Sequence, residues 1–395
     1  MTNNRTYDVI IIGGGMAVLS LALCLAKEGK SVACIDRDDP QVQATAKFDG
    51  RTIAVSAGSA EVLKKAGIWE GIKEKACPIR QINITDGGSP TLLEFLSEDI
   101  GDESFGHIIE NRIVRTALFA AAAKQKNLDH IAPQSVTDFK ISDETVTVTL
   151  ADGKTLCAQL LVGADGRGSW VREQAYIRTR GWEYNQHALI CTVQHENPHN
   201  NIALEDFRPS GPFAVLPMTD DENGNHRSSI VWTEHTSKRR SAARISEEDF
   251  HKKLNDYFPD FYGSVKKISP LQTYPLGLIH AEKYISQRLV LISDAAHGIH
   301  PIAGQGLNLG LRDILKLTEL LKDAEDCGAP ALLEEYQRAR RIDNMAMIFA
   351  TDSLNKLFSN DLLPVRMARR FGLKAVGKLP FAKKFFMKQA MGLRG

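Results

Sequence analysis

Apolar runs and helical periodicity alternate over the first 36 residues. Residues 7–13 (YDVIIIG) predict a buried strand, 16–28 have the apolar spacing of a helix, and 31–36 (SVACID) predict a second strand. Three consecutive glycines, at 13–15, separate the first strand from the helix. This order of strand, turn, helix and strand is typical of a parallel nucleotide-binding unit.

The next part of the chain predicts two helices and a β unit. Residues 49–69 predict a loop that carries Arg51, followed by a helix, and 110–126 predict an alanine-rich amphipathic helix. Alternating patterns over 135–166, with an Asp-Gly turn at 152–153, predict antiparallel strands.

The pattern changes in the second half of the chain. Many short strands, interrupted by one helix at about 246–258, fill 178–277 and predict a separate sheet-based layer. A buried strand and a Gly-rich entry then lead into a helix over 307–325, and helical segments continue to about 355.

These elements predict an α/β (α+β) fold with a Rossmann-like nucleotide-binding domain. That domain is expected in two parts, 1–177 and 278–355. Residues 178–277 would form a β-sheet substrate domain, and 356–395 a basic helical tail.

Composition is ordinary, but the charge is unevenly distributed. The 395 residues are 43% hydrophobic and 25% charged, which excludes a disordered or multi-span membrane protein. The net charge is +1, yet the chain from Arg366 onward holds nine Lys and Arg and no acid, leaving 40 bases against 48 acids elsewhere. The tail is therefore a separate electrostatic region. Six scattered cysteines without a C-x-x-C pair favour reduced thiols and a cytoplasmic protein.

The apolar stretch 9–26 could also be a signal peptide or a membrane span. A signal peptide is disfavoured because Asp8 directly precedes the apolar run and no clean cleavage site follows. A spanning helix is disfavoured because the three glycines would weaken it. The nucleotide-binding interpretation accounts for every part of the stretch.

In this interpretation the start of the helix offers free N–H groups and a partial positive charge to a pyrophosphate. Gly13 and Gly15 let the backbone turn and approach the phosphates, and Asp36 is placed to accept hydrogen bonds from a ribose. Val18 stands where G-x-G-x-x-G has its third glycine, whose role is close packing of helix on strand. We therefore expect Val18 to weaken retention of the nucleotide, and Val18→Gly to tighten it.

Two further segments carry candidate chemistry. They are GADGRGS (163–169) and the stretch 293–313, in which a helix begins at Gly304–Gly306. A helix that begins there directs N–H groups at a bound ligand and stabilises a developing anion. We expect both segments to join the glycine loop in one site.

At these positions the chain resembles the class A flavoprotein monooxygenases, which share the p-hydroxybenzoate hydroxylase fold. HPIAGQGLNLGLRD (300–313) resembles the ubiquinone-biosynthesis hydroxylases, which act on polyprenylated phenols. The resemblance covers nearly the whole chain, with DGRTIAVS, ENRIVR, GADGRGSWVR and SDAAHGIHP in family order. It implies that NAD(P)H reduces FAD, that O2 adds at the flavin C4a atom, and that the hydroperoxide hydroxylates the aromatic ring.

The resemblance also implies groups of site residues. The FAD pyrophosphate and adenosine ribose would be bound by Gly13, Gly15 and Asp36, and Arg37, Arg51 and Arg112 would also contact the cofactor. Asp165 and Gly166 would touch FAD and help to place NAD(P)H, and Asp294 would bind the ribityl chain or the pyrophosphate region of FAD. The isoalloxazine ring would lie against Pro301, Gly304, Gln305, Gly306, Leu307 and Asn308. Catalysis is assigned to Pro301, Gly304 and Gly306, and for His300 an acid–base role competes with a hydrogen bond that holds the loop.

Other interpretations remain open. Asp294, His297 and His300 could suggest a metal, but no further ligand completes a set nearby, so we expect none. A Ser-His-Asp hydrolase is disfavoured because G-x-S-x-G is missing. The substrate could be a small soluble phenol, or the chain could be a flavin-poor scaffold in a quinone-biosynthesis complex. Val18, and Ser293 where the family more commonly has glycine, motivate the scaffold.

The tail mixes its bases with aromatic and aliphatic residues, among them Phe371, Phe381, Phe385 and Phe386. Such a mixture suits an anionic membrane surface. We expect peripheral contact with the inner face of the cytoplasmic membrane, where a lipophilic polyprenylphenol would be available, and no nucleic acid. A tail that packs on the protein or on a partner is the alternative.

Overall fold

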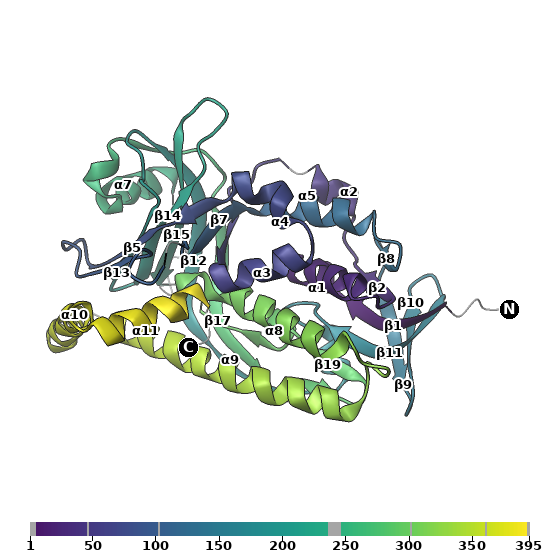
Figure 1. The fold of residues 1–395 in the computed structure, drawn as a ribbon. Coiled ribbons are helices and arrows are strands. Elements are labelled where there is room, and N and C mark those ends of the chain that lie inside the picture. The colour runs from purple at the N-terminus through teal and green to yellow at the C-terminus, as the bar shows by residue number, and fades with distance from the viewer. Residues whose placement is uncertain are drawn as a thin grey trace.

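The computed structural model describes residues 5–45, 47–101, 103–235, 246–300, 302–359 and 362–392 (Figure 1). An eight-stranded sheet has the order β18-β19-β11-β1-β2-β8, with β10 and β9 attached through β11. Its strands are β1 (Arg5–Ile12), β2 (Val32–Ile35), β8 (Leu128–Ile131), β9 (Val136–Ile141), β10 (Val146–Leu150), β11 (Thr155–Gly163), β18 (Ile285–Ser286) and β19 (Leu289–Leu291). The central strands β19, β11, β1, β2 and β8 are parallel, as the sequence predicts for a nucleotide-binding unit.

Helix α1 (Met16–Lys27) lies between this sheet and other helices. Every residue of α1 from Ala17 to Ala26 is buried, because one side packs on the sheet and the others on α3, α5 and α8. This burial explains an apolar stretch that resembles a signal peptide or a membrane span. The helices of this layer are α2 (Pro40–Ala44), α3 (Ala57–Lys65), α4 (Trp69–Ile72), α5 (Asn111–Ala122), α6 (Trp170–Gln174) and α8 (Gln305–Leu321).

A nine-stranded sheet, with the order β20-β17-β12-β15-β14-β13-β5-β6 and with β16 on β12, forms the second layer (Figure 1). Its strands are β5 (Gln81–Asp86), β6 (Leu93–Leu96), β12 (Thr179–His195), β13 (Ile202–Arg208), β14 (Gly211–Met218), β15 (His226–His235), β16 (Val265–Lys267), β17 (Gln272–Ala281) and β20 (His297–Gly298). β5 and β6 belong to this sheet although they lie within the range expected for the nucleotide-binding domain. β5 pairs in parallel with β13, although more than a hundred residues separate the two strands in the chain.

The two faces of the nine-stranded sheet have different cover. Helix α7 (Glu247–Tyr257) packs on the outer face, where Phe213, Trp232 and Phe250 form an aromatic core. The inner face lies toward α9 (Pro330–Phe358), α10 (Leu363–Lys378) and α11 (Pro380–Met391), which run along one side of the molecule (Figure 1). A three-stranded sheet of β3 (Thr52–Ser56), β7 (Gly106–Glu110) and β4 (Cys77–Ile79) closes the remaining side.

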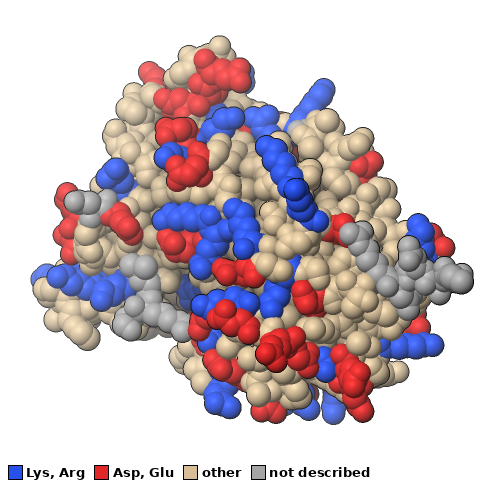
Figure 2. Space-filling view, turned by 45° about the vertical axis from the view of Figure 1, so that its right-hand side comes forward, with Lys and Arg blue, Asp and Glu red and all other residues tan. Residues whose placement is uncertain are grey.

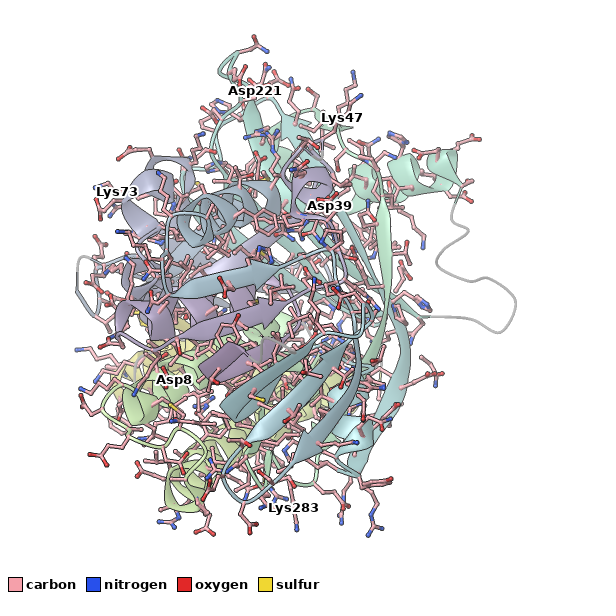
Figure 3. All side chains as sticks on the ribbon, turned by 90° about the vertical axis from the view of Figure 1, so that its right-hand side faces the viewer. Asp8, Asp39, Lys47, Lys73, Asp221 and Lys283 are labelled. Atoms are coloured by element: carbon pink, nitrogen blue, oxygen red, sulfur yellow. The ribbon has the colours of Figure 1, made fainter. Side chains whose placement is uncertain are left out.

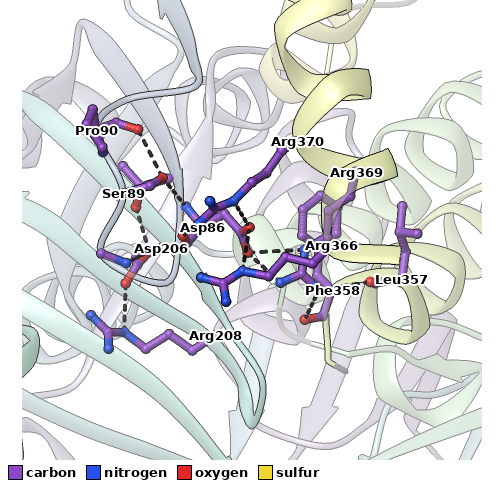
Figure 4. A network of polar contacts seen from close by, with 12 residues as sticks. Asp86, Ser89, Pro90, Asp206, Arg208, Leu357, Phe358, Arg366, Arg369 and Arg370 are labelled. Carbon is purple, nitrogen blue, oxygen red and sulfur yellow. Dashed lines mark hydrogen bonds and ion pairs between the residues drawn. The ribbon is translucent and has the colours of Figure 1, made fainter. Parts of the chain in front are cut away.

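The basic tail is helical and is anchored by ion pairs (Figure 4). The Asp86 carboxylate at the end of β5 is fully buried and accepts hydrogen bonds from Arg369 (2.5 Å) and Arg370 (2.5 Å) of α10. Lys383 pairs with Asp99 at 2.7 Å, and Met387 is buried among inner-face residues. Part of the basic run is therefore used to attach the tail to the sheet.

Charged side chains are otherwise distributed over the surface. Figure 2 shows Lys and Arg interspersed with Asp and Glu over much of one face. From the side, Lys73, Asp221 and Lys283 lie at the outer margin of the molecule (Figure 3). Among the described helices, none is long and apolar enough to cross a membrane.

Candidate active site

The three glycine-containing segments meet at the carboxyl edge of the parallel sheet. The Gly13 N–H donates to the Ile35 carbonyl at 2.9 Å, and the Ala164 N–H donates to the Ile12 carbonyl at 3.0 Å. The Ile292 N–H donates in turn to Gly163 at 3.1 Å. Because β2, β1, β11 and β19 are neighbours, the loops that follow them lie side by side at the edge where such sheets bind nucleotides.

The loop after β1 has the shape of a phosphate cradle. Gly13 has φ +127°, and a Cβ there would clash with the Ala164 carbonyl, while a Cβ at Gly14 would overlap the Asp36 carboxylate. A Cβ at Gly15 would have no atom within 4 Å. Gly15 precedes α1, whose start has no side-chain cap and no acid in its first turn, so its N–H groups are left for an anion.

Asp36 lies beside this loop. Asp36 is 8% exposed, and its burial raises the pKa of the carboxyl. Arg37 has an 85% exposed side chain whose guanidinium lies 4.0 Å from the Asp38 carboxylate, and its contact with the cofactor stays a prediction. Val18 is 2% exposed and packs in the main hydrophobic core. The predicted weakening of cofactor retention by Val18 stays a prediction.

Asp165 holds its own loop together. Its carboxylate accepts hydrogen bonds from the Ser169 hydroxyl and from the Val171 N–H (3.0 Å), at the start of α6. Gly166 has φ +86°, and a Cβ there would meet no atom within 4 Å. The side chain of Asp165 is thus engaged within the protein, and the open space lies at Gly166.

A buried polar network lies behind the third segment. Asp313 of α8 accepts hydrogen bonds from His297 (2.6 Å), Arg340 (2.7 Å) and the Ser293 N–H (2.9 Å). Burial acts to raise the pKa of Asp313, but His297 and Arg340 outweigh it and hold the pKa below its usual range. Ser293 has φ +53°, a backbone conformation that favours glycine.

By bonding to the Ser293 N–H, this network positions Asp294, the residue that follows Ser293. Asp294 lies in a short 3-10 helix, η4 (Ser293–Ala295), and is only partly buried. Desolvation raises the pKa of its carboxyl, while Arg167 and His297 oppose the rise. No hydrogen bond from Asp294 to another described residue is found, so its oxygens are available to a ligand.

The start of α8 is the second uncapped helix N-terminus of the site. Gly304 has φ +64° and lies against Ala54 of β3, and a Cβ at Gly306 would meet no atom within 4 Å. No acid or side-chain cap satisfies the first turn. Gln305 is buried, and Leu307 is partly buried against the main core.

Asn308 joins this helix start to β3. Its amide donates to the carbonyls of Ala54 (3.0 Å) and Gly304 (2.9 Å) and accepts from the Ser56 N–H (3.0 Å). Asn308 is 1% exposed. Its side chain therefore fixes the loop, and a cofactor contact there would use the backbone.

His300 is fully buried, and neither ring nitrogen has a hydrogen-bond partner among the described residues. Its ring contacts Tyr184 edge-on, with 5.1 Å between centroids. Burial lowers the pKa of His300 to about 4, so the imidazole is neutral at pH 7 and cannot act as an imidazolium acid. Pro301 lies outside the described residues.

Arg51 and Arg112 lie together at one end of the three-stranded sheet, because the Asn111 N–H donates to the Arg51 carbonyl at 3.0 Å. Arg51 pairs with Asp49 at 2.6 Å, and Arg112 pairs with Glu110 at 2.6 Å. Both arginines keep substantial exposure, 35% and 48% of the side chain, so each can also reach a ligand.

This arrangement fits a dinucleotide with a flavin ring. Two uncapped helix starts, open space at Gly15, Gly166 and Gly306, and the Asp36 carboxylate supply the donors and the acceptor that such a ligand requires. No group of three or more His, Cys, Asp or Glu able to hold a metal is found in the part of the chain that the structure describes.

Comparison with known proteins agrees with this geometry. The family described as "FAD binding domain" matches residues 6–350. The chain belongs to this family.

Relatives within the FAD-binding family cover nearly the whole chain. Ubiquinone hydroxylase UbiL of Rhodospirillum rubrum is 42% identical, with 98% of this chain and 90% of the relative aligned. The 3-demethoxyubiquinol 3-hydroxylase of Escherichia coli is 32% identical over the full length of both chains. Among solved structures, p-nitrophenol 4-monooxygenase PnpA from Pseudomonas putida has a TM-score of 0.81 at 19% identity, covering 99% of this chain and 100% of that one. The fold is therefore that of FAD-dependent aromatic monooxygenases, as the sequence predicts.

The sequence did not reveal the structural roles of Asn308, Asp313 and Arg340. All three lie in helices, and each has a partner outside its own helix: 254 residues separate Asn308 from Ala54, and 27 separate Asp313 from Arg340. The signal available for Asp313 was a charged residue on the buried side of an amphipathic helix, where an unpaired carboxylate is costly.

Proposed function

We propose that this chain is an FAD-dependent monooxygenase that hydroxylates the aromatic ring of a polyprenylated phenol in ubiquinone biosynthesis, with NAD(P)H and O2. The family match and the two hydroxylase relatives support this function. The observation that carries it is the position of the α8 start: an uncapped helix N-terminus bonded to β3 through Asn308, and preceded by His300 in contact with Tyr184 of β12.

FAD, when bound, supplies the redox and oxygen chemistry. The N–H groups at the start of α1, with Gly13 and Gly15, would hold its pyrophosphate, and Asp36 would accept hydrogen bonds from the adenosine ribose. The N–H groups at the start of α8, with Gly304 and Gly306, would stabilise negative charge on its ring. The apolar inner face would keep water away from the reacting atoms.

The inner face also suits a lipophilic substrate. Its central positions are occupied by Ile84, Ala214, Leu216, Val231 and Ile190. Apart from Glu205, which lies between Ile84 and Ala214, the polar side chains on this face bond to β3 or α9 at its edges. A prenylated phenol could therefore bury more apolar surface against this face than a small soluble phenol could.

We further propose that the tail and α9 contact an anionic membrane. Large apolar side chains are exposed along this side, including Ile342, Met345, Phe349, Leu362, Leu363, Met367, Phe371, Leu379, Phe381, Phe385 and Phe386. Four bases, Lys374, Lys378, Lys384 and Lys388, are exposed there and form no ion pair with another described residue. Apolar side chains mixed with lysines suit a surface of anionic lipids.

The first test is the purified protein. We expect a yellow protein with a flavin spectrum that oxidises NAD(P)H and hydroxylates a short-chain prenylphenol in the presence of O2. A colourless protein that does not reconstitute with FAD would support the scaffold alternative. Turnover of small phenols with no gain from a prenyl chain would support the soluble-substrate alternative.

Two further experiments address the pathway and the membrane. Deletion of the gene in its host should cause a quinone precursor that lacks one ring hydroxyl to accumulate. Flotation with vesicles of phosphatidylglycerol should recover the protein, and Lys374, Lys378, Lys384 and Lys388 changed together to Gln should reduce recovery. Equal recovery with neutral vesicles would contradict the electrostatic part of the proposal, and no recovery with either would favour a protein partner.

A further inference from the structure

Glu205 lies on the inner face of the nine-stranded sheet. Side chains alternate along β13, so Ala203, Glu205 and Phe207 point the same way. Ala203 packs in the cluster that includes Ala54 of β3 and residues of α11, and the Phe207 ring stacks on Phe358 of α9 with 3.9 Å between centroids. Glu205 therefore faces the space between β3 and α9.

The neighbours of Glu205 on this face are apolar and incompletely covered. Glu205 is opposite Ile84 of β5 and Ala214 of β14, and the same row continues through Val231 and Ile190. Ile84, Val231 and Ile190 remain partly accessible to solvent, although they lie on an inward-facing surface at the middle of the sheet. On either side of this row, other residues of the same face are covered by β3 and by α9.

Two hydrogen bonds show which elements lie on either side of this row. On one side, Thr52 of β3 bonds to Ser229 at 2.8 Å. On the other, Asn355 of α9 bonds to Gln186 at 3.1 Å. The loop that begins at His300, against Tyr184 near the start of β12, ends at Gly304, against Ala54 of β3. His300 and Gly304, which precede α8, thus contact elements on the two sides between which the row with Glu205 lies.

Glu205 differs from the acid next to it. Asp206 points to the other face, where it accepts hydrogen bonds from Thr85 (2.7 Å) and Gly88 (3.1 Å) and pairs with Arg208 at 2.6 Å (Figure 4). Glu205 has no hydrogen bond or ion pair with any residue in the described ranges. Burial, and to a smaller extent the charge of Asp206, raise the pKa of Glu205 to about 7.

The other charged groups near this face are already paired. Asp86 of β5 is bound by Arg366, Arg369 and Arg370 of α10. The remaining pairs are Arg227 of β15 with Glu110 of β7, Asp352 with Lys356 on α9, and Lys383 of α11 with Asp99. None of these pairs includes Glu205, so a hydrogen-bonding ligand on the face would find its carboxylate available.

We propose that Glu205 is a catalytic base that binds the ring hydroxyl of the aromatic substrate and accepts its proton. This inference rests on the proposed hydroxylase function and adds to it the residue that activates the ring. An apolar wall with one uncommitted carboxylate, next to the elements that carry the proposed flavin-ring residues, matches a lipophilic phenol: the ring and its side chain would lie on the wall and the hydroxyl would meet the carboxylate.

The proton and electron movements balance as follows. The O–H bond of the ring hydroxyl breaks, its proton moves to a Glu205 carboxylate oxygen, and the electron pair left on the phenolic oxygen enriches the ortho and para carbons. One of these carbons would form a bond to the terminal oxygen of a hydroperoxide derived from O2, while the O–O bond breaks and the other oxygen leaves with the bonding electron pair. That carbon then loses its hydrogen as a proton to the departing oxygen, and the protonated Glu205 returns its proton to the ring oxygen, which restores the aromatic ring and the Glu205 carboxylate.

The test compares Glu205→Gln with Glu94→Gln, using 2-geranylphenol as the probe and its O-methyl ether as a ligand without the proton. Glu94 is an exposed carboxylate of the same sheet, bonded to Gln81 at 2.6 Å, and its removal controls for charge and handling. We expect Glu205→Gln to reduce kcat for hydroxylation by about 10²–10⁴-fold, the range for loss of a general base. The rate of flavin reduction by NAD(P)H should change little.

Two readouts distinguish a base from a structural residue. In the wild type, kcat/KM should rise with pH through about 7, and this limb should disappear in Glu205→Gln but persist in Glu94→Gln. On mixing with the oxidised holoenzyme at pH 8, 2-geranylphenol should give a phenolate difference band with the wild type and with Glu205→Asp, and none with Glu205→Gln. The methyl ether should bind without the band.

The outcomes separate the two levels of the proposal. If the wild type hydroxylates the probe and Glu205→Gln does so equally well, with the same pH profile, the role of Glu205 is overturned and the hydroxylase function stands. If the wild type gives no hydroxylated product from any phenol but binds the probe as phenolate only when Glu205 is present, the hydroxylase function fails and the proton-accepting site stands.

Discussion

The two faces of the nine-stranded sheet are built from the same strands but are filled differently. On the outer face Phe213, Trp232 and Phe250 are at most 1% exposed and pack ring against ring under α7. On the inner face the adjacent residue Val231 is partly accessible, and Glu205 has an unpaired carboxylate among the described residues. Because side chains alternate along a strand, one residue can maintain the fold while the next residue contacts the ligand.

The largest effect should separate neighbouring residues of β15. Trp232→Ala leaves a large cavity in a fully buried aromatic core, so we expect a loss of about 3–5 kcal/mol in the free energy of unfolding. Val231→Ala removes two methyl groups from a partly accessible site and should cost about 1 kcal/mol, while raising KM for a prenylated phenol. Urea denaturation of the holoenzyme and steady-state kinetics measure both. Similar stability losses would contradict the contrast between the faces.

The attachment of α10 and α11, which cover part of the inner face, can be weakened without changing the face itself. Asp86→Asn leaves the buried Arg369 guanidinium without its anion, at a cost of about 3–5 kcal/mol to tail attachment. We expect faster hydrogen exchange and proteolysis in residues 363–392. Asp99→Asn breaks the more exposed pair with Lys383 and should cost less than about 1 kcal/mol. Unchanged protection of α10 in Asp86→Asn would show that apolar contacts alone hold the tail.

A substitution at Val18 of α1 tests the same distinction between packing and ligand contact, here beside the parallel sheet. Val18→Gly removes a fully buried side chain from a helix, so we expect a loss of about 3 kcal/mol in unfolding free energy. If the third glycine matters for the cofactor as predicted, the variant should still bind FAD more tightly. Titration of the apoprotein by flavin fluorescence measures the affinity, with Val18→Ala as the control that keeps the helix. Equal or weaker binding by Val18→Gly would contradict this prediction.

The smallest effect concerns the pH dependence of stability. The pKa of Glu205 is raised in the folded state, so the folded protein holds its proton more tightly than the unfolded chain, and stability falls as pH rises from about 4.5 to about 7. Glu205→Gln cannot ionise and should lack this part of the fall. We expect the Tm of the variant to gain about 1–3 °C on the wild type between pH 5 and pH 8. A constant difference would place Glu205 in contact with solvent or a cation.

Local pattern predicted much of the fold. The strand, glycine turn and helix at the N-terminus, helix α7 and the strand–turn–strand unit at 146–163 follow from periodicity and turn residues. The parallel edge also brings together the three glycine segments as predicted. What local pattern did not predict depends on distant pairing: β5 joins β13, and Asp86 anchors a helix more than 280 residues away.

Glu205 shows where sequence reasoning ended. The segment IALEDFR alternates, which places Ala203, Glu205 and Phe207 on one face. It does not say which face is packed under α7 and which lies toward β3 and α9. Adjacent acids on a strand are ordinary surface features, so only the tertiary arrangement distinguished the paired Asp206 from Glu205.

The position of the tail affects how the protein is made. Met387 and Met391 of α11 complete the cluster beside the inner face, and Gly392 lies so close to Gly58 that a Cβ on Gly58 would be 2.7 Å from the Gly392 carbonyl oxygen. These residues leave the ribosome after every described strand of the three sheets. Until α11 emerges, the nascent chain therefore carries an uncovered apolar sheet face, which makes it a client for chaperones.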